Sequence, residues 1–215
     1  MPASLIVDEL LIADPPHPWR EAGFEVEGDV CVVGTVRLRF GHPGRGIAGW
    51  SVRGAGTLEL DGLPTTASES PPPAEAPAHA NGVIAIDHVV AFSPDLNRTV
   101  AKLRAAGLDL RRVREEPTPG GAPRQAFFRV GEVILEVVQA PEDTRIARDP
   151  SGPARLWGIS FLVEDIERTA ATLGDLLGEP REAVQPGRRI ATLRKDAGLG
   201  PAVAFMTPGP EATTV

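Results

Sequence analysis

The stretch Ile86-Asp87-His88-Val89-Val90-Ala91-Phe92 opens a unit that closes with Val130-Gly131-Glu132-Val133-Ile134-Leu135-Glu136-Val137. Similar stretches run from Val7-Asp8-Glu9-Leu10 to Val36-Arg37-Leu38-Arg39, and from Leu156-Trp157-Gly158-Ile159 to Val203-Ala204-Phe205-Met206. Internal similarity indicates that one supersecondary unit was copied, and copied units share a fold. The sequence therefore predicts three related units along the chain.

The copies differ at two positions where chemistry is expected, one on the first strand and one on the last. The first-strand position holds Glu9, His88 and Gly158. The last-strand position holds Arg39, Glu136 and Phe205. Only the middle copy combines an imidazole with a carboxylate. The repeat therefore predicts the fold more clearly than it predicts an activity.

Residues 83–140 carry the complete pattern of the unit. Val83 to Phe92 is typical of a strand, and apolar residues from Leu96 to Leu108 then recur at helical spacing. Three further strands follow, which gives the order β-α-β-β-β. Residues 155–208 repeat this order. The expected fold class is α+β, with the paired units forming a cup-shaped mixed sheet.

The N-terminal part, residues 1–63, is an abridged third unit followed by a predicted hairpin of Ile47–Arg53 and Thr57–Leu60. Residues 64–82 include the run TTASESPPPAEAPAHAN, which lacks apolar periodicity and is rich in Pro, Ala and Ser. Such composition is typical of an extended, flexible linker. We expect the abridged unit either to cover the cup or to pair across a homodimer.

The bulk properties narrow the possible partners. A net charge of -7 argues against binding to nucleic acid or to an anionic membrane surface. The single cysteine, Cys31, excludes an intrachain disulfide, and its valine neighbours predict a buried thiol.

No basic stretch precedes an apolar run near the N-terminus, so we expect no signal peptide and a cytoplasmic location. His17, His42 and His79 lie among loop residues and are expected at the surface.

A duplicated β-α-β-β-β unit with His on its first strand and Glu on its last resembles the vicinal oxygen chelate superfamily. This superfamily includes glyoxalase I, bleomycin-resistance proteins and extradiol dioxygenases. The resemblance is carried by Ile86–Val90, Phe127–Gly131 and Ile134–Val138, with Trp157–Phe161 and Val163–Ile166 in the third copy. It covers residues 83–208 well and residues 4–40 weakly. It implies a cup formed by two units, which in the enzymes holds a divalent metal.

Carried over residue by residue, the resemblance places His88 and Glu136 at two metal-ligand positions and at the catalytic positions. Gly158 and Phe205 take the partner positions and cannot bind metal. Because catalytic sites usually need three protein ligands, we expect no tightly bound metal. The alternative is a divalent ion (Zn, Fe, Mn or Ni) with Glu9 as a third ligand. A Glu9–Arg39 ion pair is the favoured account of Glu9.

Five further residues are expected to bind ligand in the cup. Ser160, Phe205 and Thr207 are assigned to the face that Gly158 occupies, where the two hydroxyls can meet a ligand. Arg124 and Arg129 can favour a carboxylate or phosphate if they enter the cup. The alternative places both arginines at a solvated sheet edge.

Three functions remain open at this point. The preferred one is a glyoxalase-like protein that binds or sequesters a small organic molecule in the cup, with a degenerate metal site. The second is a metal-dependent lyase, isomerase or dioxygenase. The third is a metal-free enzyme that uses His88 or Glu136 for acid–base catalysis.

Overall fold

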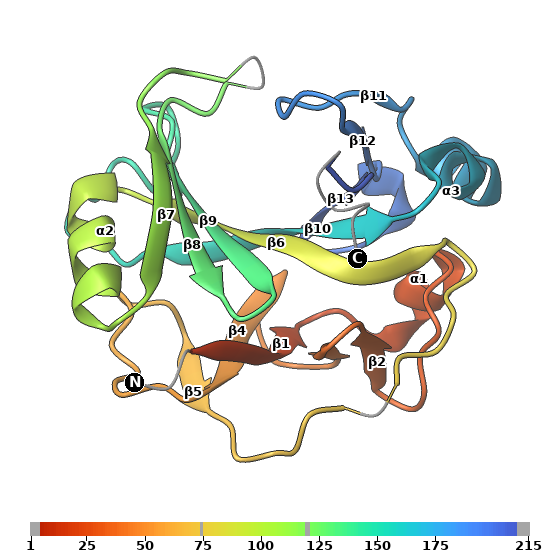
Figure 1. Cartoon of the computed structure of the whole chain (residues 1–215), viewed down its shortest axis with the longest axis horizontal. Coiled ribbons are helices and arrows are strands. Elements are labelled where there is room, and N and C mark those ends of the chain that lie inside the picture. The colour runs from red at the N-terminus through yellow and green to blue at the C-terminus, as the bar shows by residue number, and fades with distance from the viewer. Residues whose placement is uncertain (1–4, 74, 119–120, 210–215) are drawn as a thin grey trace.

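The structure is a computed structural model that describes residues 5–73, 75–118 and 121–209. The chain forms two mixed sheets that lie one on the other, with helices at their ends (Figure 1). The smaller sheet has five strands in the order β2-β3-β1-β4-β5, and the larger has eight in the order β11-β12-β13-β10-β6-β9-β8-β7. The fold class is α+β, as the sequence predicts.

The large sheet consists of two copies of the predicted unit. The first copy comprises β6 (Val83–Ser93), α2 (Leu96–Ala105), β7 (Asp109–Arg114), β8 (Gln125–Val130) and β9 (Val133–Gln139). The second comprises β10 (Arg155–Val163), α3 (Ile166–Leu173), β11 (Arg181–Glu182), β12 (Arg189–Thr192) and β13 (Ala202–Met206), with short 3₁₀ turns at Gly174–Leu176 and Lys195–Ala197. In each copy the first and last strands pair in parallel, and β6 joins β10 antiparallel.

Aspartates fix where the two main helices begin. The carboxylate of Asp95 accepts a hydrogen bond from the backbone N–H of Arg98, and Asp165 accepts two such bonds at the start of α3. N-cap bonds of this kind satisfy donors that a helix leaves unpaired. Each helix then buries one apolar stripe against the sheet, so both lie at the outside of the cup.

The small sheet contains the abridged unit. It comprises β1 (Ile6–Ile12), α1 (Pro16–Glu21), β2 (Val30–Val33), β3 (Val36–Arg39), β4 (Ile47–Arg53) and β5 (Thr65–Ala67). The order β2-β3-β1 matches β8-β9-β6, with β1 parallel to β3. β4 pairs with β1 and β5 rather than with residues 57–60, so the predicted hairpin does not form. Nearby Asp61 is instead buried against Arg98 of α2, a tertiary contact that local turn chemistry does not reveal.

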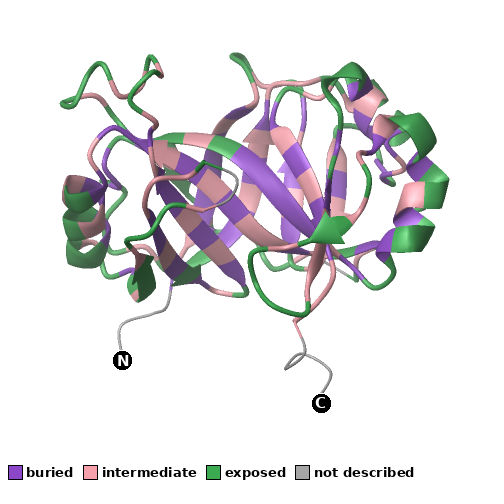
Figure 2. Cartoon of the chain, turned by 90° about the horizontal axis from the view of Figure 1, so that it is seen from above, coloured by how far each residue is buried: buried purple, intermediate pink, exposed green. Residues whose placement is uncertain are grey.

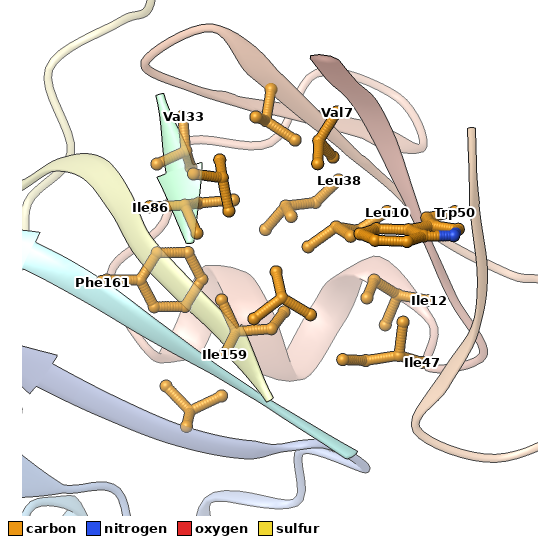
Figure 3. Packing of buried hydrophobic residues seen from close by; sticks show 14 of the residues in the cluster. Val7, Leu10, Ile12, Val33, Leu38, Ile47, Trp50, Ile86, Ile159 and Phe161 are labelled. Carbon is orange, nitrogen blue, oxygen red and sulfur yellow. The ribbon is translucent and has the colours of Figure 1, made fainter. Parts of the chain in front are cut away.

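The two sheets pack back to back through a shared hydrophobic core. Val7, Leu10 and Trp50 of the small sheet point towards Ile86 and Phe161 of the large one (Figure 3). Buried and partly exposed residues alternate along the strands of the large sheet (Figure 2), the pattern of a sheet with two different faces. The N-terminal unit therefore covers the back of the large sheet and leaves the cup open on the opposite face.

Cys31 lies in this core, as the sequence predicts. Burial raises the pKa of its thiol to about 12, so the thiol stays protonated and unreactive.

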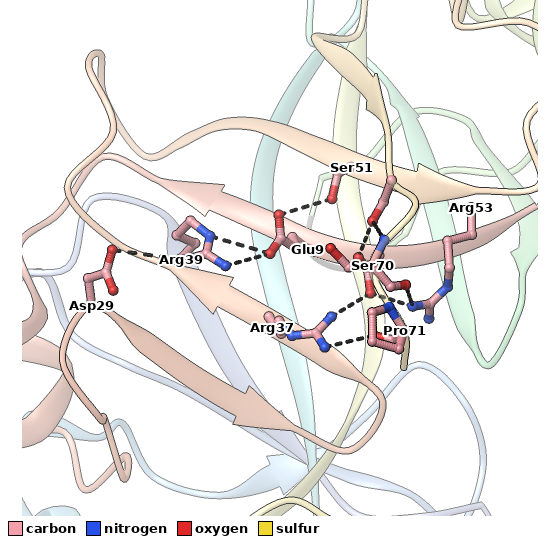
Figure 4. A network of polar contacts seen from close by, with 10 residues as sticks. Glu9, Asp29, Arg37, Arg39, Ser51, Arg53, Ser70 and Pro71 are labelled. Carbon is pink, nitrogen blue, oxygen red and sulfur yellow. Dashed lines mark hydrogen bonds and ion pairs between the residues drawn. The ribbon is translucent and has the colours of Figure 1, made fainter. Parts of the chain in front are cut away.

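The segment expected to be a flexible linker makes specific contacts along the small sheet. Thr65–Ala67 forms β5, the hydroxyl of Ser68 donates to buried Asp8 at 2.5 Å, and Arg37 donates to the carbonyl of Pro71 (Figure 4). Asp8 also pairs with Arg37 at 2.8 Å and Arg53 at 2.7 Å. These contacts hold the first part of the segment against β1, while the mobility of its remainder stays a prediction.

His79, at the far end of this segment, is not at the surface as the sequence suggested. Only 7% of it is exposed. Its Nδ1 accepts from the N–H of Glu25, and its Nε2 contacts the carbonyl of Val32 at 3.0 Å. The described residues include no helix long and apolar enough to cross a membrane.

Candidate functional site

The cup contains two cavities that meet over the centre of the large sheet. The first, about 340 Å³, is mainly apolar and is lined by Val90, Phe92, Val138, Trp157 and Ala204, among others. The second, about 600 Å³, lies towards β7 and β11 and is more polar. His88, Glu136 and Ile190 line both cavities. The residues that the sequence selects as the chemical pair therefore lie where the two cavities join.

A β-bulge precedes the first-strand position in each copy of the unit. In the pairing of β6 with β10, Asp87 of β6 and Trp157 of β10 have no partner residue. In the pairing of β1 with β4, Asp8 of β1 has none. A bulge adds one residue to a strand and re-aims its neighbours. Asp87 can consequently contact its own neighbour His88, although adjacent side chains on a regular strand point to opposite faces.

Asp87, His88 and Glu136 form the centre of a polar chain across the floor of the cup. Asp87 Oδ2 lies 2.6 Å from His88 Nδ1, and His88 Nε2 lies 3.4 Å from Glu136 Oε2. Arg188 donates to Asp87 Oδ1 at 2.6 Å, and Gln125 donates to the other oxygen of Glu136. These contacts confirm the prediction that His88 and Glu136 are neighbours that line one cavity.

Asp87 remains ionised over a wide pH range. Burial alone would raise the pKa of its carboxyl, but hydrogen bonds and charges from His88 and Arg188 outweigh burial and hold the pKa below its usual value of 3.8. An ionised Asp87 accepts a hydrogen bond from His88 Nδ1–H and so fixes the orientation of the imidazole ring. Nε2 then faces Glu136, and this contact is favourable only when one of the two groups carries a proton.

Two buried polar atoms beside this chain have no hydrogen-bond partner among the described residues: Ser160 Oγ and Gln125 Oε1. Ser160 is 2% exposed, pairs with His88 across the strands and lines the apolar cavity. Gln125 lines the polar cavity. Buried polar groups are normally paired, so the exceptions point to a missing partner.

The structure corrects the position of Phe205. Val90 pairs with Glu136, and the corresponding residue Ser160 pairs with Ala204, so Ala204 is the true counterpart of Glu136. Phe205 points to the other face, is fully buried and packs 6.4 Å from the ring of Phe24. A shift of one residue moves a strand side chain to the opposite face, and Phe205 belongs to the core instead of the cup.

Three other predicted ligand-binding residues lie outside both cavities. Thr207 accepts a hydrogen bond from the backbone N–H of Arg189 at 2.9 Å. Arg124 pairs with exposed Glu115 at 2.6 Å, which corresponds to the alternative of a solvated sheet edge. Arg129 is exposed on β8. Of the five predicted residues, only Ser160 lines a cavity of the cup.

Glu9 is not a third member of the site. It lies on β1 of the small sheet, where Arg39 donates to it at 2.8 Å and Ser51 at 3.2 Å. This is the ion pair that the sequence favoured. Glu9 and His88 occupy matching positions in their units, but the units place them on different sheets.

The donor set of the cup does not fit a metal ion that needs three protein ligands. Among residues 5–73, 75–118 and 121–209, no three His, Cys, Asp or Glu side chains gather in an arrangement that could hold one. His88 and Glu136 supply two donors, whereas Gly158 and Ala204 supply none. A Cβ on Gly158 would lie 2.9 Å from the carbonyl oxygen of Ala202, so the strand pairing also resists a ligand at that position.

The fold, the strand pairing and the cup define the vicinal oxygen chelate architecture. A solved structure with this architecture, methylmalonyl-CoA epimerase from Mycobacterium tuberculosis, is 18% identical; the match covers 62% of this chain and 94% of that one, with a TM-score of 0.50. A variant methylmalonyl-CoA epimerase from Streptomyces coelicolor with bound 2-nitronate-propionyl-CoA is 24% identical. That match covers 60% of this chain and 96% of the epimerase chain, with a TM-score of 0.48. No protein-family model and no curated protein matches the sequence.

Sequence reasoning missed four residues of the site: Asp87, Gln125, Trp157 and Arg188. Asp87 had a signal, because it precedes His88 as Asp8 precedes Glu9 in the first copy. Trp157 takes the same place in the third copy. No sequence signal marked Gln125 or Arg188, because their roles depend on how β8 and the loop before β12 approach the floor of the cup.

Proposed function

We propose that the cup binds a small organic molecule without the help of a tightly bound metal. The observation that carries this proposal is the unpartnered hydroxyl of Ser160, buried beside His88 in an apolar cavity. An unsatisfied buried hydroxyl destabilises a protein by about 1–3 kcal/mol. A carbonyl or hydroxyl of a bound ligand would supply the missing partner.

The walls of the apolar cavity suit the body of such a ligand. Val90, Val138 and Ala204 offer small apolar surfaces. Phe92 and Trp157 pack with their ring centroids 4.9 Å apart, and Trp157 is 48% exposed. An exposed tryptophan at a cavity mouth is a strong contact for a planar group, because aromatic contacts contribute beyond their buried area.

The proposal is tested by ligand-observed NMR with a library of apolar fragments that each carry one carbonyl or hydroxyl. We expect fragments that bind the wild-type protein to lose most of their affinity in Ser160→Ala and in Trp157→Ala. Ser151→Ala is the matched control, because Ser151 is exposed in a turn and its hydroxyl donates only to Asp149. Fragments that bind all four proteins equally would contradict the proposal.

Acid–base catalysis is the second candidate function, and the geometry of His88 favours it. Asp87 holds the imidazole through Nδ1, and Nε2 lies 3.4 Å from Glu136 Oε2. Such a pair can both accept and return a proton. Methylmalonyl-CoA is a suitable probe, because similarly folded proteins are named as its epimerases.

For this candidate, we expect deuterium from D₂O to enter methylmalonyl-CoA in the presence of a chelator, and His88→Ala to abolish the exchange. An absence of exchange with the wild-type protein would contradict catalysis on this compound and leave the binding proposal standing.

A further inference from the structure

We infer that the ligand of the cup is an elongated organic anion, with an apolar body in the first cavity and a carboxylate or phosphate in the second. This inference rests on the proposed binding function and adds the chemical class of the ligand. The two cavities share His88, Glu136 and Ile190. One molecule can therefore extend across the join and occupy both.

Three arginines of the second cavity carry the argument: Arg112, Arg114 and Arg181. None of them has an ion pair or a side-chain hydrogen bond within the described part of the chain. The neighbouring arginines differ, because Arg111 pairs with Asp109, Arg124 with Glu115, and Arg189 with Glu167. Arg129 of β8 also has no such partner among the described residues but is exposed outside both cavities, so what sets the three arginines apart is that they line one cavity without a partner there.

The three arginines come from opposite ends of the sheet. Arg112 and Arg114 lie on β7 and Arg181 on β11, the two outermost strands in the eight-strand order. The sheet curls until these edges line one cavity, and the connecting loops face each other above the cup (Figure 1). Like charges that converge on one space repel each other, and an anion between them relieves the repulsion.

Acidic side chains line the second cavity in the same number as the arginines, so the less exposed charges decide which head group it prefers. Glu136 is held by Gln125 and His88 at the floor. Glu116 and Glu182 are exposed, as are Arg112 and Arg181, so water screens all four charges. Arg114 is the best placed of the three arginines, because it is only partly exposed.

The test compares phenylbutyrate, phenylbutyramide and phenylbutylamine, which share a body and differ in the charge of the head group. Binding is followed by ligand-observed NMR, which also measures the affinity of Trp157→Ala. We expect the acid to bind about tenfold more tightly than the amide, which corresponds to about 1.4 kcal/mol. The amine should bind most weakly, and added salt should weaken only the acid.

Variants locate the head group. Arg114→Gln should weaken the acid about tenfold and leave the amide unchanged, since only the acid loses a charge-assisted hydrogen bond. Arg111→Gln is the matched control, because Arg111 lies on the same strand but is exposed and paired with Asp109. Both variants are checked for wild-type melting temperatures.

The remaining outcomes separate this inference from the binding proposal. Equal affinities of acid and amide, both reduced by Trp157→Ala, would overturn the anionic class while the cup remains a binding site. Tightest binding by the amine would also overturn the anionic class, and would indicate that Glu116 and Glu182 bind the head group. If none of the three binds but neutral fragments occupy the cup, the inference fails alone. If no compound occupies the cup, the binding proposal fails with it.

Discussion

At the scale of single residues, Gly158 decides what the cup can do. It stands where the middle unit has His88, and its missing side chain leaves the floor apolar beside Ser160. The carbonyl of Ala202 would lie 2.9 Å from any Cβ at this position. A single substitution of Gly158 therefore cannot introduce a metal-binding side chain unless the paired strand shifts.

The metal content of the protein follows from this residue. We expect no stoichiometric metal after purification without chelators, because His88 and Glu136 alone provide fewer donors than metal sites use. Added Zn, Mn, Fe or Ni should shift the melting temperature equally little in the wild-type protein and in His88→Ala. Elemental analysis that finds about one metal per chain, lost in His88→Ala, would be evidence against this expectation and for the metal-dependent enzyme.

The adjacent acids Asp8 and Glu9 provide a matched pair for stability. The side chain of Asp8 is fully buried between Arg37 and Arg53, whereas those of Glu9 and Arg39 are 16% and 36% exposed. Removing one partner of a buried ion pair costs about 3–5 kcal/mol, and partly exposed pairs contribute about 0–1 kcal/mol. Urea denaturation should show this large loss for Asp8→Ala and a much smaller one for Glu9→Ala; equal losses would contradict the assignment of Asp8 as the anchor.

At the scale of elements, the segment from Thr65 to Asn81 is attached to the rest of the molecule at both ends. Its two ends are fixed by different means. β5 and Ser68 attach the beginning to β4 and Asp8, and buried His79 and Asn81 attach the end to the turn after α1. The tract between them is largely exposed.

His79 makes the stability of this element depend on pH. Burial lowers the pKa of its imidazole, although the carbonyl of Val32 and the charge of Glu25 act in the opposite direction. The neutral ring accepts from Glu25 N–H, and a second proton on Nδ1 would place two donors face to face. The unfolded chain takes up that proton near its ordinary pKa of about 6.5, so stability is present above this pH and is lost as the pH falls towards the lower folded value.

We therefore expect denaturation midpoints of the wild-type protein to fall between about pH 8 and about pH 5 more than those of His79→Gln. His17→Gln is the control, because its side chain is 75% exposed. An equal pH dependence in all three proteins would show that His79 does not remain neutral in the folded state.

The elements also show which parts of the fold and of the site could be predicted from the sequence. The repeat of Asp8-Glu9, Asp87-His88 and Trp157-Gly158 was sufficient to predict two complete units, their strand order and the His88–Glu136 pair. It failed at β13, because Val203 to Met206 are all apolar and contain no alternation that fixes the register. It also failed at residues 57–60, and at Gln125 and Arg188, where contacts between distant segments determine the outcome.

At the scale of the whole molecule, the two sheets depend on each other. The rings of Trp19 and Phe24 lie 6.3 Å and 5.0 Å from that of Phe161, on the back of the large sheet. Phe205 joins the same cluster. Without the N-terminal unit this apolar face would meet water, so the two parts form one cooperative structure.

Limited proteolysis with a glutamate-specific protease tests this dependence. Glu69 and Glu75 are exposed in the Thr65–Asn81 segment, and we expect cleavage after them to leave residues 83–215 folded. The two pieces should remain together on size-exclusion chromatography and separate only in denaturant. Fragments that separate under native conditions, or early cuts inside Val83–Val138, would contradict this prediction.

The arginine-bearing edges of the large sheet also bear on solubility. β7 exposes Arg111 and Arg112, and β11 has only two residues, one of them Arg181. Edge strands present unpaired backbone groups that can recruit strands from another chain, and charged or very short edges oppose this. Strand addition at these two edges should therefore be disfavoured, and a homodimer would have to use a surface other than a continuation of the large sheet. The arginines that we assign to ligand recognition would then also keep concentrated protein in solution.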